Sequence, residues 1–326
     1  MNRNSFSIII IPDTQSVTRN HPHLLEPMAG WIVDHAQELN VKIVLQLGDI
    51  VDSGANDEEQ FVAAFDTMDR LREANIPFVI CPGNHDYDNL LSEDRSLTMY
   101  NRYFGPQLYR NQQWFGGLYK EDSAENMFVK LDAEGRKLLV LALEFGPRDE
   151  VLAWADGVLE AHQDHEAIVI THCYMNIRGE RTKADDNLNP KNYPGSFDAN
   201  DGEDVWQKSL RKHPNVIAVF SGHHVPGNVS YRVDLGDNGN PVFQSFQNWQ
   251  MTHCGGEGRF RIMRFLADKD ELEFSVVHPQ TGAYEEVSGY RVSLPFQRQR
   301  LEIPEASVEW STFCYPSQIS KAVKEH

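Results

Sequence analysis

Five polar residues of the kinds that bind metal ions each follow a short apolar run. They are Asp13, Asp49, Asn84, His172 and His223. Carboxylate oxygen, amide oxygen and imidazole nitrogen together suit Mn, Fe, Zn or Co better than Ca, and the absence of thiolate from the set argues against a structural zinc site. The residue types therefore predict a divalent metal centre, provided that the fold brings the five side chains together.

The apolar runs predict the elements that position these residues. Short runs rich in β-branched residues, predicted as strands, lie at residues 6–11, 42–47, 78–81, 138–143, 167–171 and 216–220. Segments with helical spacing lie between several of them, at residues 24–39, 58–74, 149–162 and 203–212. Near-continuous apolar strands alternating with helices are typical of buried, largely parallel sheet. Because the carboxyl ends of parallel strands face one edge, we expect the polar clusters to converge there.

The pattern changes after residue 221. Strands separated by turn signals are predicted at residues 229–235, 242–246, 260–266 and 272–277. They indicate an antiparallel meander in the same domain. Two further segments, 100–119 and 173–202, lack periodicity and are expected to be irregular. Irregular segments of that length in a compact domain tend to be functional or mobile.

Composition limits the classes of function. The chain of 326 residues is 40% hydrophobic and 24% charged, which is typical of globular proteins, and its formal net charge is −18. An acidic surface repels nucleic-acid phosphates and anionic lipid, so we expect no extensive nucleic-acid binding and no membrane association. A small phosphorylated substrate stays compatible where a metal ion reverses the local field. The sequence predicts no particular oligomeric state.

Cysteine usage and the N-terminus bear on location. The four cysteines, Cys81, Cys173, Cys254 and Cys314, are far apart and form no C-x-x-C pair. A reducing compartment is therefore expected. The apolar run at residues 6–11 is too short for a signal-peptide core, and no stretch is long and apolar enough to span a membrane. The expected location is cytoplasmic, although a chain without its leader would look the same.

The polar motifs resemble those of the calcineurin-like metallophosphoesterases. The matching residues are Asp13-Thr14-Gln15, Gly48-Asp49-Ile50-Val51-Asp52, Gly83-Asn84-His85-Asp86, His172 and Gly222-His223-His224. They occur in the family's order over roughly the first two-thirds of the chain. The resemblance implies an α/β fold, a four-layer αββα sandwich of two mixed β-sheets flanked by helices. We expect this domain to cover residues 1–290, with a C-terminal extension over residues 291–326 packed on it.

Transferred residue by residue, the resemblance implies a centre of two divalent transition-metal ions, Mn, Fe or Zn. Asp13 is expected to bind the first ion and Asp49 to bridge both. Asn84, His172 and His223 are expected to complete the second site. Two such ions ~3.5–4 Å apart can activate a bridging hydroxide and neutralise charge on a phosphoryl group.

The implied reaction is hydrolysis of a phosphate ester by in-line attack of metal-bound hydroxide. His85 is expected to contact the phosphoryl oxygens or protonate the leaving group, with Asp86 orienting its imidazole. Asp52 is expected to support the loop by hydrogen bonding rather than to bind metal. Whether the substrate is a monoester or a diester stays open.

Two departures from the family pattern affect the first ion. Gln15 stands where the family has histidine, and its amide oxygen is the weaker donor. The last motif places its second histidine at His224, one position early, so that Val225 occupies the expected position. Gln15 and His224 are candidate ligands of the first site, and a structural role for His224 stays open. The first site is expected to be weaker, selective for a harder metal such as Mn, or filled only with substrate present.

The residues around the ligands also carry expectations. Gly48, Gly83 and Gly222 precede proposed ligands and would permit a tight turn and close backbone approach. Three arginines are candidates for substrate binding: Arg148, Arg178 and Arg181. The alternatives are a helix-capping turn around the first of these and a solvated surface loop around the other two.

Two further function classes stay open. The first is a degenerate relative that keeps the fold and acts as a metal-binding scaffold or binding protein without turnover, as Gln15 and Val225 suggest. The intact His85 argues against it, since a scaffold has no use for a catalytic histidine that binds no metal. The second is a mononuclear enzyme that acts on something other than phosphate.

Overall fold

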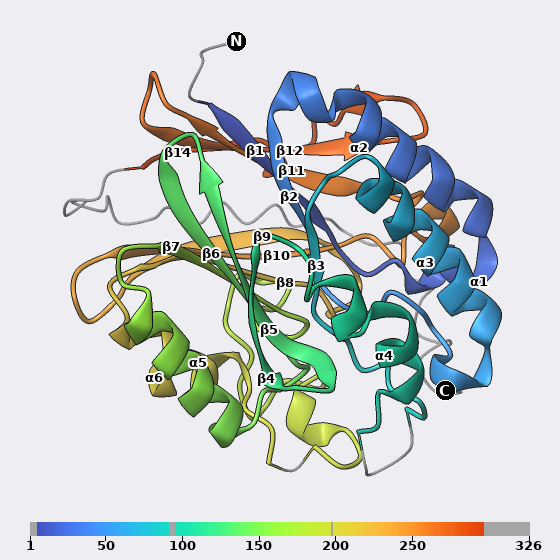
Figure 1. Ribbon diagram of the computed structural model, residues 1–326, viewed down its shortest axis with the longest axis horizontal. Coiled ribbons are helices and arrows are strands. Elements are labelled where there is room, and N and C mark those ends of the chain that lie inside the picture. The colour runs from blue at the N-terminus through green and yellow to red at the C-terminus, as the bar shows by residue number, and fades with distance from the viewer. Residues whose placement is uncertain (1–4, 91–94, 197, 297–326) are drawn as a thin grey trace.

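The computed structural model describes residues 5–90, 95–196 and 198–296, which form two β-sheets packed face to face with helices on the outer sides (Figure 1). Helices α1 to α3 lie along the first sheet, and α5 and α6 cover the second. The helices are α1 (Gln15–Asn20), α2 (Leu25–Leu39), α3 (Glu58–Glu73), α4 (Thr98–Phe104), α5 (Asp149–Ala161) and α6 (Gly202–Lys208). This four-layer αββα arrangement confirms the predicted fold class.

The first sheet has the strand order β13-β12-β11-β1-β2-β3, with β14 also pairing with β12. Its strands are β1 (Phe6–Ile11), β2 (Val41–Gln46), β3 (Phe78–Ile80), β11 (Phe260–Leu266), β12 (Glu271–His278), β13 (Ala283–Tyr284) and β14 (Val292–Pro295). Strands β1, β2 and β3 are parallel, and β11 runs antiparallel to β1. The carboxyl ends of the three parallel strands therefore meet at one edge.

The second sheet has the order β4-β5-β6-β7-β8-β10-β9. Its strands are β4 (Phe115–Lys120), β5 (Ser123–Ala133), β6 (Arg136–Leu143), β7 (Glu166–Thr171), β8 (Val216–Ser221), β9 (Asn228–Leu235) and β10 (Pro241–Asn248). Strands β6, β7, β8 and β10 are parallel, and this sheet too has carboxyl strand ends on one edge.

Alternating side chains of the central strands are buried on both faces. On β6, Leu138 and Val140 join the core between the two sheets, whereas Leu139 and Leu141 pack in the core with Val151 of α5. A strand covered on both faces needs apolar residues at every position, because successive side chains point to opposite faces. This is why the strand reads as a continuous apolar run in the sequence.

The predicted antiparallel meander is corrected by the sheet topology. Strands β9 and β10 form a hairpin in the second sheet, whereas β11 and β12 form one in the first. The chain crosses between the sheets at residues 249–259, which include the short 3-10 helix His253–Gly256. Periodicity identifies each strand but not its partner, so it cannot distinguish one meander from two separate hairpins.

The segment predicted to be irregular at residues 100–119 contains most of α4 and β4. Strand β5 was not predicted, because its polar residues hide the pattern: Asn126 is fully buried and pairs with Glu144 instead of facing solvent. Residues 173–202 are largely irregular, as predicted, with one isolated bridge between Met175 and Arg181.

Strand β14 pairs with β12, so the beginning of the predicted extension at residues 291–326 lies on the first sheet. Residues 297–326 lie outside the described part, and the boundary at residue 290 stays a prediction. Within the described residues, no helix has both the length and the apolar character needed to cross a bilayer.

Candidate metal centre

The five proposed ligands stand at the carboxyl ends of strands from both sheets. Asp13, Asp49 and Asn84 follow β1, β2 and β3 of the first sheet, and His172 and His223 follow β7 and β8 of the second. All five are buried. The site is therefore built at the edge where the two sheets meet, with its oxygen donors from one sheet and its imidazoles from the other.

Three of these side chains converge closely. Ligand atoms of Asp49, His172 and His223 all lie within 4.8 Å of one another. His172 Nε2 is 3.1 Å from Asp49 Oδ2 and 3.8 Å from Asp13 Oδ1. His223 Nδ1 is 3.2 Å from His172 Nε2. Two carboxylates and two ring nitrogens thus surround one small volume.

The outer hydrogen bonds of the histidines fix which nitrogens face that volume. His172 Nδ1 lies 2.8 Å from the carbonyl oxygen of Leu47, and His223 Nε2 lies 2.9 Å from that of Leu188. A carbonyl only accepts, so both nitrogens must donate. His172 Nε2 and His223 Nδ1 are then the atoms open to a proton or a metal ion, an arrangement common among metal-binding histidines.

Several buried amide oxygens lack a hydrogen-bond partner among the described residues, and two of them belong to proposed ligands, Gln15 Oε1 and Asn84 Oδ1. Gln15 belongs to the same loop cluster, because its backbone N–H donates to the Asp49 carbonyl. A buried polar atom without a partner is costly and needs an explanation. A bound cation would be the missing partner of both oxygens. The donor set of carboxylate, amide and imidazole fits a divalent transition metal.

Electrostatics at the centre favour a positive charge. Burial raises the pKa of Asp13 to about 7, and His172 only partly offsets this. Burial disfavours charge on His172, but Asp49 and Asp13 outweigh it and raise the pKa of His172 to about 9. The pKa of His223 is held well below its usual value, first by burial and then by His172, so that its imidazole is neutral. A neutral imidazole beside clustered carboxylates is the state in which histidine binds metal.

The glycines that precede the ligands leave room for them, as predicted. A Cβ on Gly83 would lie 2.2 Å from Asp49 Oδ1, and one on Gly222 would lie 2.0 Å from Asp13 Oδ2. Asp49 and His223 themselves have positive φ angles of 49° and 74°. Such conformations in residues other than glycine cost of order 1–3 kcal/mol and cluster at functional sites.

Replacing Gly222→Ala should therefore weaken metal binding. The added methyl displaces the Asp13 carboxylate, and we expect a loss of about 10–100-fold in manganese affinity, as when groups that position ligands are removed. Equilibrium dialysis measures the affinity, with circular dichroism to verify folding. Gly157→Ala on α5 is the matched control, because nothing lies within 4 Å of the added Cβ. Equal affinities in the two variants would contradict the close approach.

His85 and Asp86 have different partners from those expected. The Asp86 carboxylate accepts hydrogen bonds from the backbone N–H groups of Ile50, Val51 and Gly83. His85 Nδ1 instead donates to the Asp52 carbonyl oxygen at 2.7 Å. The expectation that Asp86 orients His85 is thus corrected: Asp86 ties the two motif loops together, and Asp52 orients the imidazole.

His85 borders the centre. Its backbone N–H donates to Asp49 Oδ1 at 2.9 Å, and its side chain is 25% exposed. Burial opposes a charge on His85, but the carboxylates of Asp49 and Asp52 outweigh it, so its pKa is raised. Because Nδ1 donates to Asp52, Nε2 is the ring atom left for a substrate.

The structure places His224 against Cys173, with Nε2 3.7 Å from the thiol sulfur, and the three-residue metal cluster does not include it. Its ring also contacts Phe246. Burial lowers the pKa of His224 to about 4, so the side chain is neutral.

The three arginines predicted to bind substrate lie in ion pairs. Arg148 makes two 3.0 Å hydrogen bonds to the Glu144 carboxylate. Arg181 is buried against Glu203 and Asp234. These carboxylates already accept from the guanidinium N–H groups of Arg148 and Arg181, which are the donors that a substrate anion would need. Arg178 is exposed, with acidic neighbours in its own loop.

Two residues that line the centre were not predicted from the sequence. The Tyr193 hydroxyl lies 3.2 Å from His223 Nε2, and the Phe145 ring packs on both His172 and His223. Tyr193 and Leu188 belong to the irregular segment 173–202, whose length and basic residues were the signals that it had a role. Nothing in its composition indicates which residue of the segment reaches the site.

The fold and the site together define a metallophosphoesterase architecture. The chain belongs to the calcineurin-like phosphoesterase family, which it matches over residues 6–227.

Relatives and solved structures are consistent with this assignment. An uncharacterized protein of Bacillus subtilis strain 168, YvnB, is 28% identical over 281 residues. That match covers 85% of this chain, which spans about 20% of the length of YvnB. A dimetal phosphatase from Danio rerio superposes with a TM-score of 0.56 at 14% identity, covering 90% of this chain and 99% of that one. GAP50, the anchor in the inner membrane complex of Plasmodium, gives a TM-score of 0.51 at 12% identity, covering 91% and 90%. At these identities the two structures support the fold alone.

Proposed function

We propose that the protein hydrolyses a phosphate ester at a centre of two divalent cations. The observation that carries the proposal is the convergence of His172 Nε2 and His223 Nδ1, both facing the Asp49 carboxylate with their other nitrogens held by backbone carbonyls. Bound cations at this position would lower the pKa of a coordinated water and neutralise charge that develops on a phosphoryl group.

The donor atoms suggest how the ions are held. Asp49 would be shared by both ions, with Asn84, His172 and His223 completing the second site. Asp13 and Gln15 would hold the first ion together with Asp49. We leave His224 out of this set, because its Nε2 lies against Cys173. A first site made mainly of oxygen donors favours manganese.

The chain's own groups account for the remaining chemistry. His85, oriented through Nδ1 by Asp52, presents Nε2 to the leaving oxygen and donates a proton to it. Asp86 fixes the loops that carry Asp49 and His85 relative to one another through its three hydrogen bonds to backbone N–H groups. The net charge of −18 favours a small phosphorylated substrate over a nucleic-acid polymer. We also infer a reducing, cytoplasmic location from the free thiols of the described cysteines.

A second candidate function is metal-dependent binding without turnover. The observation that favours it is the contact of His224 with Cys173, which leaves the first site with fewer strong donors. This candidate predicts metal binding but no hydrolysis, whereas the main proposal predicts both.

Hydrolysis assays separate the two candidates. Metal-stripped protein is assayed on bis-p-nitrophenyl phosphate and p-nitrophenyl phosphate with Mn, Zn, Fe, Ni and Mg added singly. Turnover that requires a transition metal supports the phosphoesterase, and the preferred compound indicates a diesterase or a monoesterase. Metal-loaded, folded protein without turnover on these esters would favour the binding protein.

Substituting Gln15→His tests the assignment of the first site. Imidazole nitrogen is a stronger donor than an amide oxygen, so manganese should bind the weaker site more tightly, on the order of tenfold. Titration calorimetry measures the two binding steps. Gln37→His, on the exposed face of α2, is the control. An unchanged weak step would remove Gln15 from the ligand set.

A further inference from the structure

Arg19 places a positive charge beside the proposed catalytic histidine. It lies in the last turn of α1, the helix that begins at Gln15. Its side chain is 58% exposed, and Nη1 donates to Asp52 Oδ2 at 2.7 Å. Among the described residues no second partner of this guanidinium is seen. Because a guanidinium has five N–H donors, Arg19 keeps donors that face solvent.

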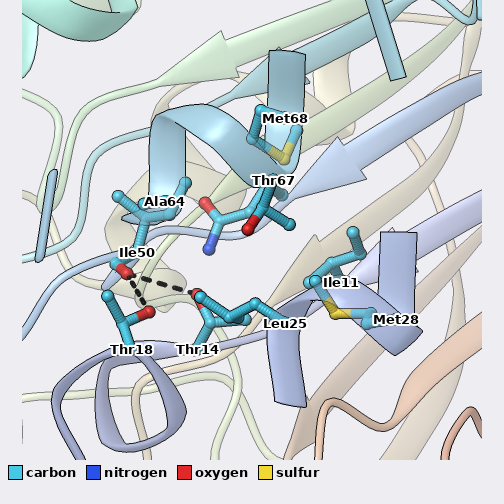
Figure 2. Close-up of a pocket in the computed structure, with 10 residues that line it drawn as sticks. Ile11, Thr14, Thr18, Leu25, Met28, Ile50, Ala64, Thr67 and Met68 are labelled. Carbon is cyan, nitrogen blue, oxygen red and sulfur yellow. Dashed lines mark hydrogen bonds between the residues drawn. The ribbon is translucent and has the colours of Figure 1, made fainter. Parts of the chain in front are cut away.

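Helix α1 is fixed to the loop after β2. The hydroxyls of Thr14 and Thr18 both donate to the Ile50 carbonyl oxygen, at 3.3 and 2.8 Å (Figure 2). The backbone N–H groups of Thr14 and Gln15 donate to the Asp49 carbonyl oxygen. The cavity beside these threonines has a volume of about 10 Å³, room for at most one water. The backbone that carries Arg19 therefore has little freedom to move away from the motif loop.

Asp52 connects Arg19 to His85. The Asp52 carboxylate pairs with Arg19 through Oδ2, and its Oδ1 lies 3.8 Å from His85 Nδ1. The Arg19 guanidinium and the His85 imidazole therefore both lie beside the Asp52 carboxylate. Asp52 and Arg19 lie on the Nδ1 side of the His85 ring, whereas Nε2 is the atom left for the substrate. A leaving group would therefore reach Arg19 by extending past the edge of the imidazole.

Charge makes this position significant. The proposed cations would offset the carboxylates of the centre itself, but Asp52 lies beside His85 and the whole chain is acidic. An anionic group of the substrate that passes Asp52 would be repelled unless a cation compensated it. Arg148 and Arg181 bind carboxylates of their own with several donors. Arg19 uses one donor in its ion pair and, as an arginine, can bind a carboxylate or phosphate in a forked geometry.

We propose that Arg19 binds a second anionic group, a carboxylate or a phosphate, carried by the leaving group of the substrate. The preferred substrates are then phosphate esters or anhydrides with a second negative charge beyond the reacting phosphate, rather than esters of neutral alcohols. This inference rests on the proposed function and names its substrate class.

A pair of non-hydrolysable phosphonates tests the proposal through binding. 3-Phosphonopropionate and propylphosphonate have the same length and differ by one terminal carboxylate. Calorimetry on the manganese-loaded protein gives both dissociation constants. We expect the wild type to prefer the carboxylated compound by about tenfold, the value of one hydrogen-bonded charge. Arg19→Met should abolish this preference with little change for propylphosphonate, and Arg19→Lys should restore part of it.

Arg211→Met is the matched control. Arg211 is a partly exposed arginine that is likewise paired with an aspartate, Asp237 at 2.7 Å, and it also bonds Gln207. It precedes β8 and so lies at the strand end opposite to the one that leads to His223. It should keep the wild-type preference. Equal binding of the two phosphonates by the wild type, or the same preference in Arg19→Met, overturns the proposal while leaving the phosphoesterase intact. Failure of the wild type to bind either phosphonate counts against both.

Discussion

Replacing Asp49 by asparagine is expected to remove metal binding and lower hydrolysis by at least about a thousandfold, since several kcal/mol of charge stabilisation are lost with the ions. Asp49 is buried, lies 3.1 Å from His172 Nε2 and receives the backbone N–H of His85 through Oδ1. Asparagine keeps the size of the side chain but loses its charge, and its NH₂ group cannot accept. Metal content by mass spectrometry and turnover of the nitrophenyl esters are measured on the same preparation.

The control for this change is Asp122→Asn, at an exposed position in the turn between β4 and β5. It should leave both quantities unchanged. If Asp49→Asn kept its metal and its activity, the shared carboxylate would not be the centre of the site.

Substituting His85→Asn is expected to lower turnover by about 10²–10⁴-fold, the usual contribution of a general acid, while metal content stays at the wild-type value. The reason is that His85 contributes only its backbone N–H to Asp49, and its ring is oriented by Asp52 toward the substrate. Asparagine retains the backbone contact and removes the proton donor. The retention of metal distinguishes this variant from Asp49→Asn.

A comparable histidine away from the site provides the control. His165 pairs with Asp164 at 2.7 Å but precedes β7, at the edge opposite to His172. His165→Asn should leave turnover unchanged. Loss of metal in His85→Asn would instead indicate that His85 supports the ligands, and undiminished turnover would exclude it as the proton donor.

The ligand positions could be predicted because strand ends leave a local signal. Asp13, Asp49 and Asn84 each follow a buried strand, and parallel pairing brings such positions to one edge. The same reasoning placed His172 and His223 together through β7 and β8. The spacing did not indicate that two sheets contribute, because it carries no information on which strands pair.

The supporting contacts could not be predicted, because they depend on where loops pass. The partner of His85 is a backbone carbonyl of Asp52, and the partner of His223 is one of Leu188. Every residue carries the same backbone carbonyl, so residue types do not show which carbonyl a histidine contacts. His224 was expected to reach the first ion, yet a neighbouring loop places Cys173 against it. Arg19 was overlooked because a single arginine in a short helix carries no motif.

The most direct test of the account is a crystal structure of the manganese-loaded protein with anomalous scattering recorded for manganese. The account predicts two anomalous peaks, both at the Asp49 carboxylate, one bordered by Asn84, His172 and His223 and the other by Asp13 and Gln15. One peak alone would reduce the centre to a single ion and remove Asp13 or His172 from the proposed sets. No peak at these residues in folded, manganese-treated protein would contradict the metal centre itself.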